Sequence, residues 1–128
     1  MSDALENADT DLPRLQIRVY VDDVNWFGPG KAELLELIRQ TGSISAAGRR
    51  MDMSYKRAWT LVETLNGMFR EPLVASARGG PHGGGATLTP LGEAMLACYR
   101  RIEAAARAAT AAEAGAMRAA ARDMAERK

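Results

Sequence analysis

Residues 42–66 constrain the fold of this chain more than any other stretch, because they encode two short helices with a tight break between them. The sequence there is GSISAAGRRMDMSYKRAWTLVETLN. Ser45 is a good N-terminal cap for the first helix, and Ile44 before it can act as a hydrophobic staple. Residues 52–53 form the break, and Ser54 then caps the second helix.

The second of these helices has two chemically different faces. Its apolar residues follow the i, i+3, i+4, i+7 spacing of a buried stripe, which comprises Ala58, Leu61, Val62 and Leu65. A rotation of about 100° per residue turns polar side chains to the opposite face. That face carries Lys56, Thr60 and Glu63, with Arg57 and Thr64 on one flank and Tyr55 and Trp59 on the other. Helix-turn-helix proteins present such a polar, cationic face to the major groove of DNA.

The residue types on this face suit double-stranded DNA as a partner. Lys56 and Arg57 can neutralise phosphates or donate to guanine, and Thr60 can reach a base edge or a phosphate. Most polar helix faces are merely solvated, however, and the periodicity alone leaves that alternative open. The residues of this unit that we predict to contact DNA are Arg49, Arg50, Ser54, Tyr55, Lys56, Arg57 and Thr60.

Positive charge is concentrated around the two-helix unit, although the net charge of the chain is only +1. Residues 1–36 carry eight acidic side chains against three basic ones, whereas residues 43–85 carry six basic against three acidic. The low net charge argues against non-specific coating of nucleic acid. The uneven distribution is a modest electrostatic footprint for a polyanion.

The segment in front of the two helices is predicted to open with a tail and a strand. Residues 1–13 are polar and acidic, which is typical of a disordered tail. Residues 14–21 alternate apolar and polar side chains and predict a half-buried strand. The link at 22–30 is rich in turn-forming residues and carries Trp26 and Phe27, for which we expect anchoring positions in the core.

Elements on either side of the two-helix unit complete the pattern of a winged helix. A supporting helix is predicted at 31–40, with Gly42 as its C-terminal stop. Short strands are predicted at 73–77 and 86–89, and the glycine-rich tip at 78–85 joins them into a hairpin. Helix, helix and hairpin follow one another in the order of a winged helix.

The hairpin tip, RGGPHGGG, has several interpretations. Its glycines allow close approach of the backbone to a partner, and we predict backbone contacts with DNA for Arg78 and His82. A nucleotide-binding P-loop is disfavoured because the Lys-Ser/Thr pair is missing. His82 is the sole histidine and lacks partners at ligand spacing, so we predict no metal site. An unstructured linker is the remaining alternative, which the flanking strands disfavour.

A long alanine-rich helix is predicted over about 91–127. Thr89 caps it, Pro90 takes its first position, and Gly115 can divide it in two. Its apolar stripe begins with Leu91, Met95, Cys98, Tyr99 and Ile102. Because the helix is too long to bury this stripe against so small a body, we expect a homodimer formed through it. A helix that projects into solvent is the alternative.

Composition disfavours other classes of protein. Cys98 is the only cysteine, so no intrachain disulfide can form, which fits the cytoplasm, and we expect it as a small buried hydrophobe. We find no signal peptide and no apolar run long enough for a membrane span. One histidine, one cysteine and scattered carboxylates give no catalytic constellation, so we predict neither an enzyme nor a cofactor.

Two segments give the chain a specific resemblance to a known family. GSISAAGRRMDMSYKRAWTLVETLN and LVASARGGPHGGGATLTPLG resemble the N-terminal DNA-binding domain of ModE-type molybdate-responsive transcriptional regulators. The resemblance covers residues of about 14 to 105. It implies a winged-helix dimer on a palindromic operator, with a reading helix at 54–66 and a wing at 78–85. LysR-type regulators share the Gly-Ser-Ile-Ser-x-Ala-Ala style of start but not the rest.

These observations together predict a mainly α fold with a small antiparallel β component, a winged helix-turn-helix with a long C-terminal dimerisation helix. We expect a disordered tail at 1–13, a DNA-binding domain at 14–105 and an alanine-rich helical extension at 106–128. Full-length ModE regulators carry molybdate-binding domains, which we do not expect in this chain, so we expect no direct molybdate binding.

The predicted function is that of a sequence-specific, ModE-like DNA-binding transcriptional regulator, linked to molybdenum or oxyanion-related gene control. Two alternatives stay open. The winged helix could serve as a protein-interaction module, or the regulator could respond to an unrelated effector.

Overall fold

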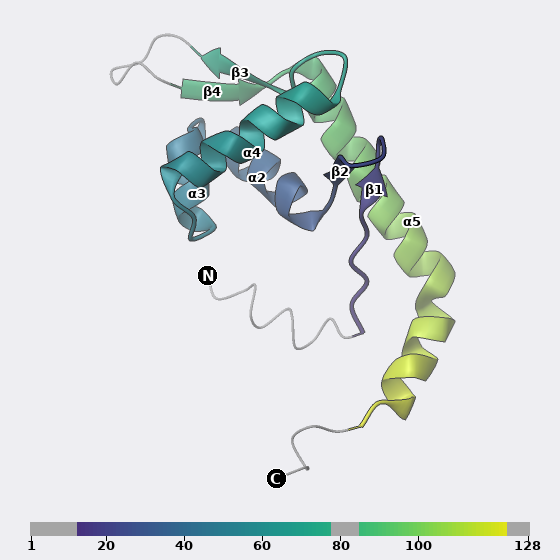
Figure 1. Ribbon diagram of the computed structural model, residues 1–128. Helices are drawn as coiled ribbons and strands as arrows, with labels where there is room; N and C mark the ends of the chain where they lie inside the picture. The colour runs from purple at the N-terminus through teal and green to yellow at the C-terminus, as the bar shows by residue number, and fades with distance from the viewer. Residues whose placement is uncertain (1–12, 78–84, 123–128) are drawn as a thin grey trace. The chain divides into compact units, whose positions relative to one another are not determined.

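The computed structural model describes residues 13–77 and 85–122 (Figure 1). The chain forms two compact units, one of which is Ile17–Arg101 and contains the core and the candidate site. The elements in chain order are β1 (Val19–Tyr20), β2 (Trp26–Phe27), α2 (Pro29–Thr41), α3 (Ile44–Arg50), α4 (Tyr55–Met68), β3 (Val74–Ala77), β4 (Gly85–Leu88) and α5 (Pro90–Ala120).

Helix α2 supplies the centre of the core. It starts at Pro29, because a proline in the first turn has a preset φ and its missing N–H needs no acceptor. Leu34, Leu35 and Ile38 on its inward face have no exposed surface. Gly42 ends the helix with a left-handed φ of 71°, and its N–H donates to the Ile38 carbonyl at 2.7 Å. The predicted stop at Gly42 is confirmed.

Helix α3 is capped by Ser43, and the predicted cap at Ser45 was wrong. Ser43 is extended, and its Oγ accepts from the backbone N–H of Ala46 at 3.0 Å. Ser45 lies inside the helix, where its Oγ accepts from Arg49 Nη1 at 2.8 Å. The left-handed Gly42 redirects the chain within one residue, so Ser43 is the first residue that can take the extended conformation of a cap.

The break between α3 and α4 and the cap of α4 are confirmed. Asp52 takes a left-handed φ of 58° in the break. The Oγ of Ser54 accepts from the N–H of Arg57 at 3.1 Å. The helices approach closely because Gly48 has no side chain at their crossing, where a Cβ would lie 2.8 Å from the Cβ of Ala58.

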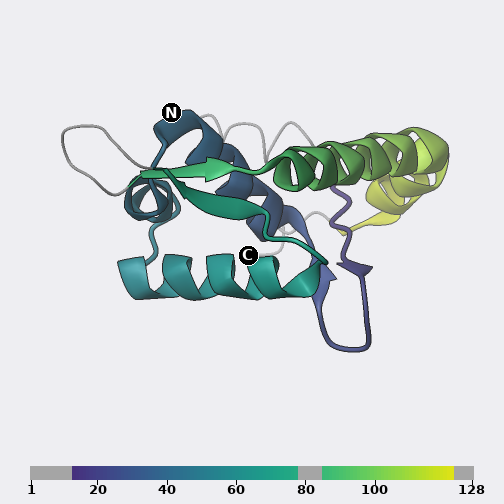
Figure 2. The same cartoon turned by 90° about the horizontal axis from the view of Figure 1, so that it is seen from above.

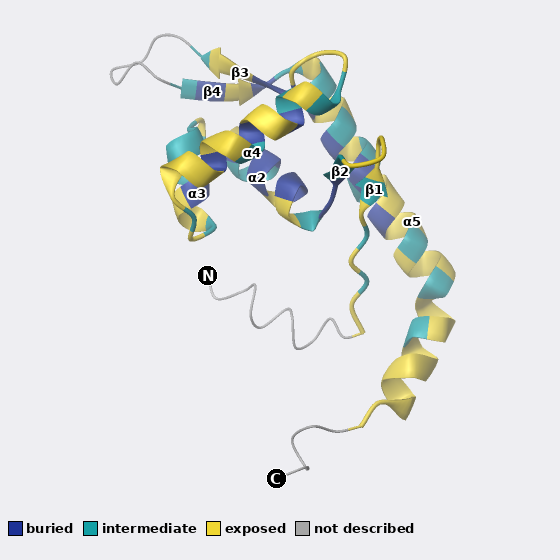
Figure 3. Ribbon diagram, in the orientation of Figure 1, coloured by how far each residue is buried: buried dark blue, intermediate teal, exposed yellow. Residues whose placement is uncertain are grey.

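The buried face of α4 contributes to the same core as α2 (Figure 3). Ala58, Val62 and Leu65 are buried as predicted, and Leu61 is half-buried at the edge of the stripe. Further core residues come from α3, β2, the second hairpin and the residue before it, and the first turns of α5. They include Phe27, Ala47, Leu73, Val74, Leu88, Leu96 and Tyr99.

The first hairpin is shorter than the predicted strand at 14–21. Burial alternates from residue 15 to residue 20 as expected, but only Val19 and Tyr20 form a ladder, with Phe27 and Trp26 as their antiparallel partners. The partner strand lies in the segment predicted to be a link. The strand length was wrong because a ladder needs a partner, and here the chain reverses directly after Tyr20.

Asp22 holds the reversal between β1 and β2. Its carboxylate accepts from the backbone N–H groups of Val24 and Asn25 at 2.9 and 2.8 Å, and from Asn25 Nδ2 at 2.9 Å. The side-chain bond from Asn25, followed by the two backbone bonds, lowers the pKa of the Asp22 carboxyl.

Of the two aromatic residues of β2, Phe27 is buried and Trp26 is half-buried. Two cations lie over the Trp26 ring, with Arg18 Cζ 3.9 Å and Lys31 Nζ 3.4 Å from its centroid. Burial lowers the pKa of Lys31, and the charge of Arg18 adds to this. The expected core position is therefore confirmed for Phe27. Trp26 is only half-buried, and its ring is covered by the side chains of Arg18 and Lys31.

Helix α5 begins as predicted. The Thr89 hydroxyl accepts from the Gly92 N–H at 2.9 Å and donates to the Pro72 carbonyl at 2.7 Å, and Pro90 is the first helical residue. Its first turns are held to α2 by two ion pairs between side chains, Arg39 with Glu93 and Arg100 with Glu36.

The predicted division of α5 at Gly115 was wrong, because the helix is continuous over 31 residues. A single interior glycine costs only about 1 kcal/mol relative to alanine, which the alanine-rich neighbours offset. Leu96 and Tyr99 are its buried apolar residues, Cys98 is half-buried, and Ile102 is 41% exposed. Among the described residues, no helix is both long and apolar enough to cross a membrane.

Candidate nucleic-acid interface

The outer face of α4 carries the side chains that sequence analysis selected. Lys56, Arg57 and Thr60 are all exposed, because α4 uses the opposite face for the core. Within residues 13–77 and 85–122, no ion pair engages Lys56 or Arg57, so both charges are available to a partner. A shallow depression of about 310 Å³ runs over this surface between Ser54 and Leu61.

The arginines of α3 lie at its last turn. Arg49 and Arg50 are both exposed, and Arg49 Nη1 donates to the Ser45 hydroxyl one turn earlier. Both residues come directly before the break that leads into α4. Contacts of these arginines with DNA stay a prediction.

The second hairpin is fastened beside α4 (Figure 2). Its antiparallel register runs from Val74 opposite Leu88 to Ala77 opposite Gly85, so the predicted hairpin is confirmed. Asn66 of α4 accepts from the N–H groups of Leu73 and Val74 through Oδ1, at 2.9 and 3.0 Å. Its Nδ2 donates to the Val74 carbonyl at 3.1 Å. One side chain therefore sets the position of β3 relative to α4.

A second contact fixes the other strand of the hairpin. The N–H of Ala86 donates to the carbonyl of Gly42 at 2.9 Å, which ties β4 to the end of α2. The base of the predicted wing is thus held to two helices. Arg78 and His82, which we predicted to contact DNA from the tip, lie outside the described residues.

A groove of about 280 Å³ separates α4 from the hairpin. Tyr55 and Trp59 form one wall, with parallel rings 6.5 Å apart. The hydroxyl-bearing residues Ser43, Ser45 and Ser76 line it as well. Sequence analysis put Trp59 on a flank of α4 but gave it no role, because only the position of the hairpin turns that flank into the wall of a groove.

No cluster of three or more histidine, cysteine, aspartate or glutamate side chains able to hold a metal ion occurs in the described parts of the chain. The surface around α4 instead combines cations, hydroxyls and aromatic rings. Such a surface suits noncovalent recognition of a polyanion with apolar parts.

The architecture defines a class of protein. Three helices, of which the third presents an exposed cationic face, lead into a two-stranded hairpin packed beside that helix. This is a winged helix, and here it is followed by a long C-terminal helix.

Comparison with known proteins shows which proteins the chain is similar to. No family model matches the chain. It is 49% identical over 77 residues to the molybdenum-pterin-binding protein MopB of Rhodobacter capsulatus, covering 60% of this chain and 28% of MopB. It is 42% identical over 73 residues to the molybdenum transport protein ModE of Azotobacter vinelandii, covering 57% and 27% of the two proteins.

A third relative is the DNA-binding transcriptional dual regulator ModE of Escherichia coli K12, with 35% identity over 86 residues, which are 67% of this chain and 30% of that protein. These matches confirm the resemblance of the chain to ModE-type proteins. It spans less than a third of the length of these relatives.

Proposed function

We propose that this protein is a sequence-specific DNA-binding transcriptional regulator in molybdenum-related gene control. The observation that carries the proposal is the exposed, cation- and hydroxyl-bearing face of α4, which is hydrogen-bonded through Asn66 to the hairpin beside it. The similarity to transcriptional regulators and to a molybdenum-pterin-binding protein supports both the regulatory and the molybdenum-related part of the proposal. It needs no catalytic group and no cofactor.

In this proposal α4 enters the major groove. Lys56, Arg57 and Thr60 contact base edges or phosphates, with Ser54 and Tyr55 at the start of the helix, where recognition helices meet the bases. Glu63 lies on the same exposed face nearer the C-terminal end, where it would repel phosphates, which also directs DNA toward the start of α4. The backbone contacts are assigned to Arg49, Arg50, Arg78 and His82.

The proposal includes a homodimer on a palindromic operator. Helix α5 exposes Ile102 at 41% and Met117 at 76%, and the residues between them are rich in alanine. An exposed apolar stripe of this kind suits a two-fold contact between copies, and a two-fold dimer reads a palindrome. We assign the DNA-binding domain to residues 14–105 and the extension at 106–128 to dimerisation, in the cytoplasm.

The decisive experiment is affinity selection from random duplex DNA, with and without molybdate. A two-fold symmetric motif is the expected result, and its absence would overturn the proposal. A change of motif or affinity with molybdate would show that this chain senses the oxyanion itself.

A protein-interaction module is the second candidate, favoured by the exposed Met117 on α5. The dependence of binding affinity on salt concentration distinguishes the two functions. The affinity for DNA should fall steeply between about 50 and 200 mM salt, because counterions are released from each neutralised phosphate. The affinity of a protein partner held on an apolar helix should respond little to the same change.

A further inference from the structure

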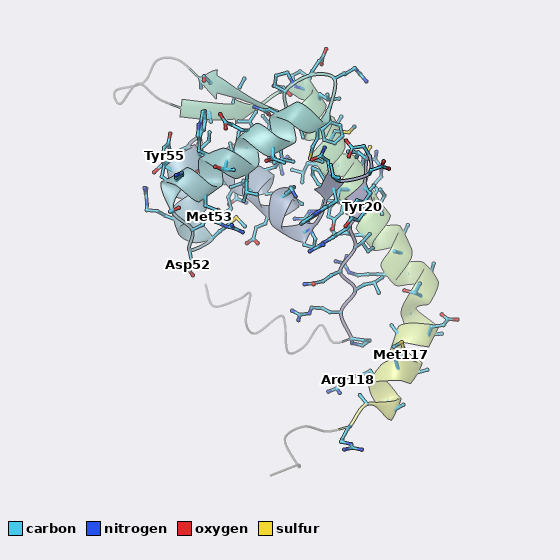
Figure 4. All side chains as sticks on the ribbon, viewed as in Figure 1. Tyr20, Asp52, Met53, Tyr55, Met117 and Arg118 are labelled. Atoms are coloured by element: carbon cyan, nitrogen blue, oxygen red, sulfur yellow. The ribbon has the colours of Figure 1, made fainter. Side chains whose placement is uncertain are left out.

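The groove between α4 and the second hairpin has an aromatic wall that is open to solvent. Tyr55 is 58% exposed and Trp59 is 41% exposed, and their rings lie within 10° of parallel. Figure 4 labels Tyr55 at the N-terminal end of α4. Large aromatic surface that is exposed rather than packed inward marks a contact surface.

The rest of the groove is neutral and rich in hydroxyl groups. The hydroxyls of Ser43 and Ser45 accept hydrogen bonds from the Ala46 N–H and from Arg49, so each retains its own O–H for donation. Ser76 of β3 is exposed and lines the groove too. None of the described residues that line the groove is charged.

When a helix and a neighbouring hairpin bind one duplex, part of the DNA backbone must lie between them. A helix in the major groove and a hairpin in the adjacent minor groove are separated by one sugar–phosphate strand. That strand has an apolar sugar face and phosphate oxygens that accept hydrogen bonds. An aromatic wall and a set of hydroxyl donors match those two chemistries.

We propose that this groove seats one deoxyribose–phosphate strand, with a sugar packed on the Tyr55–Trp59 pair and phosphate oxygens accepting from the serine hydroxyls. The proposal rests on the proposed DNA-binding function and adds a contact of a different kind to it. Because none of the described lining residues is charged, we expect this contact to contribute affinity that depends neither on salt nor on sequence. The cations on the outer face of α4 contribute affinity that depends on salt.

The test compares Trp59→Ala, Trp59→Phe and the wild-type protein on the selected operator and on a random duplex across a salt series. Trp59→Ala should weaken binding to both duplexes by the same factor, about 5- to 50-fold, which lies within the range for loss of an aromatic ring that stacks on a base. The slope of log affinity against log salt should not change. Trp59→Phe keeps a ring and should recover most of the loss.

Tyr20→Ala is the matched control, because Tyr20 is 56% exposed on β1, far from Tyr55 in Figure 4. It should leave both affinities unchanged. A loss confined to the operator in Trp59→Ala would mean that the ring reads a base, and unchanged affinities would mean that the groove is empty. Either result overturns the proposal. Failure of the wild type to bind any duplex would instead overturn the proposed function.

A second readout does not depend on the folding of Trp59→Ala. The chain has two tryptophans, so Trp26→Phe leaves Trp59 as the single emitter. Saturation with duplex should shift its emission to shorter wavelength and protect it from quenching by acrylamide, because a sugar then covers the ring. Unchanged emission and quenching at saturation would also overturn the proposal.

Discussion

Among the glycines that the structure describes, Gly92 is the one at which an added methyl group meets the least space. A Cβ there would overlap the carbonyl oxygen of Leu73, which already accepts from the Thr89 N–H at 2.9 Å. The Thr89 hydroxyl in turn bonds the Gly92 N–H and the Pro72 carbonyl. The start of α5 and the start of β3 are therefore joined through backbone groups that only glycine leaves room for.

Gly92→Ala should lower the free energy of unfolding by about 1–3 kcal/mol, the usual cost of overpacking a filled site. Urea denaturation followed by circular dichroism measures this. Gly115→Ala is the matched control, because nothing lies within 4 Å of a Cβ at that position of the same helix. It should raise helicity and stability, and equal effects of the two substitutions would contradict the close approach.

Lys56 carries the sharpest prediction on the outer face of α4. Lys56→Ala should weaken operator binding by about 1–3 kcal/mol if the ammonium group reads a base, and should reduce the salt slope by about 1 if it contacts a phosphate. A mobility-shift titration at several salt concentrations separates the two roles. An unchanged titration would remove Lys56 from the interface.

Glu63→Gln provides the opposite control on the same face. Removal of that negative charge should strengthen binding to any duplex, most at low salt, because phosphates are no longer repelled. If Glu63→Gln weakened binding, the exposed face of α4 would not be the surface that meets DNA.

At the scale of elements, the caps of the two-helix unit give a test of local structure. Ser43→Ala should cost about 1 kcal/mol of stability, because it leaves the Ala46 N–H without its capping oxygen. Ser45→Ala removes only an exposed contact with Arg49 and should cost a few tenths of that. Thermal denaturation of both variants shows which serine caps α3. A larger loss of stability in Ser45→Ala than in Ser43→Ala would contradict the observed start of the helix.

Most elements could be predicted because their signals are local. Gly42 and Ser54 act through their own backbone and nearest turn, and the apolar stripe of α4 repeats within one helix. The signal for the start of α3 was ambiguous, because the side chains of Ser43 and Ser45 can both cap a helix. The turn at Gly42 selects Ser43.

Features that depend on distant partners could not be predicted. The length of β1 depends on where β2 lies, and the chain between them could pair in several registers. The exposed face of α4, with Lys56 and Thr60, could be predicted from the periodicity of the helix alone. The groove required the position of the hairpin, which is set by Asn66 and by the contact between Gly42 and Ala86.

At the scale of the whole molecule, the proposed dimer rests on the exposed apolar side chains of α5. The helix exposes Met117 at 76% and Ile102 at 41%, whereas the neighbouring Glu103 is buried and forms an ion pair with Arg107 at 3.8 Å. Burial of these apolar side chains against a second copy would stabilise a dimer through the hydrophobic effect. A dimer also doubles the number of reading helices that one operator meets.

Met117→Glu should therefore raise the dissociation constant of the dimer at least about tenfold, which corresponds to about 1.4 kcal/mol. Sedimentation equilibrium measures this, with circular dichroism to verify that helicity is kept. Val24→Glu is the matched control, because Val24 is 74% exposed in the turn of the first hairpin. It should leave the dimer intact. A wild-type protein that is monomeric at micromolar concentration would overturn the proposed dimer. A Met117→Glu protein that dimerises as tightly as the wild type would show that the interface does not include Met117. Operator binding should follow assembly, so Met117→Glu should lose more affinity for the full palindrome than for a single half-site.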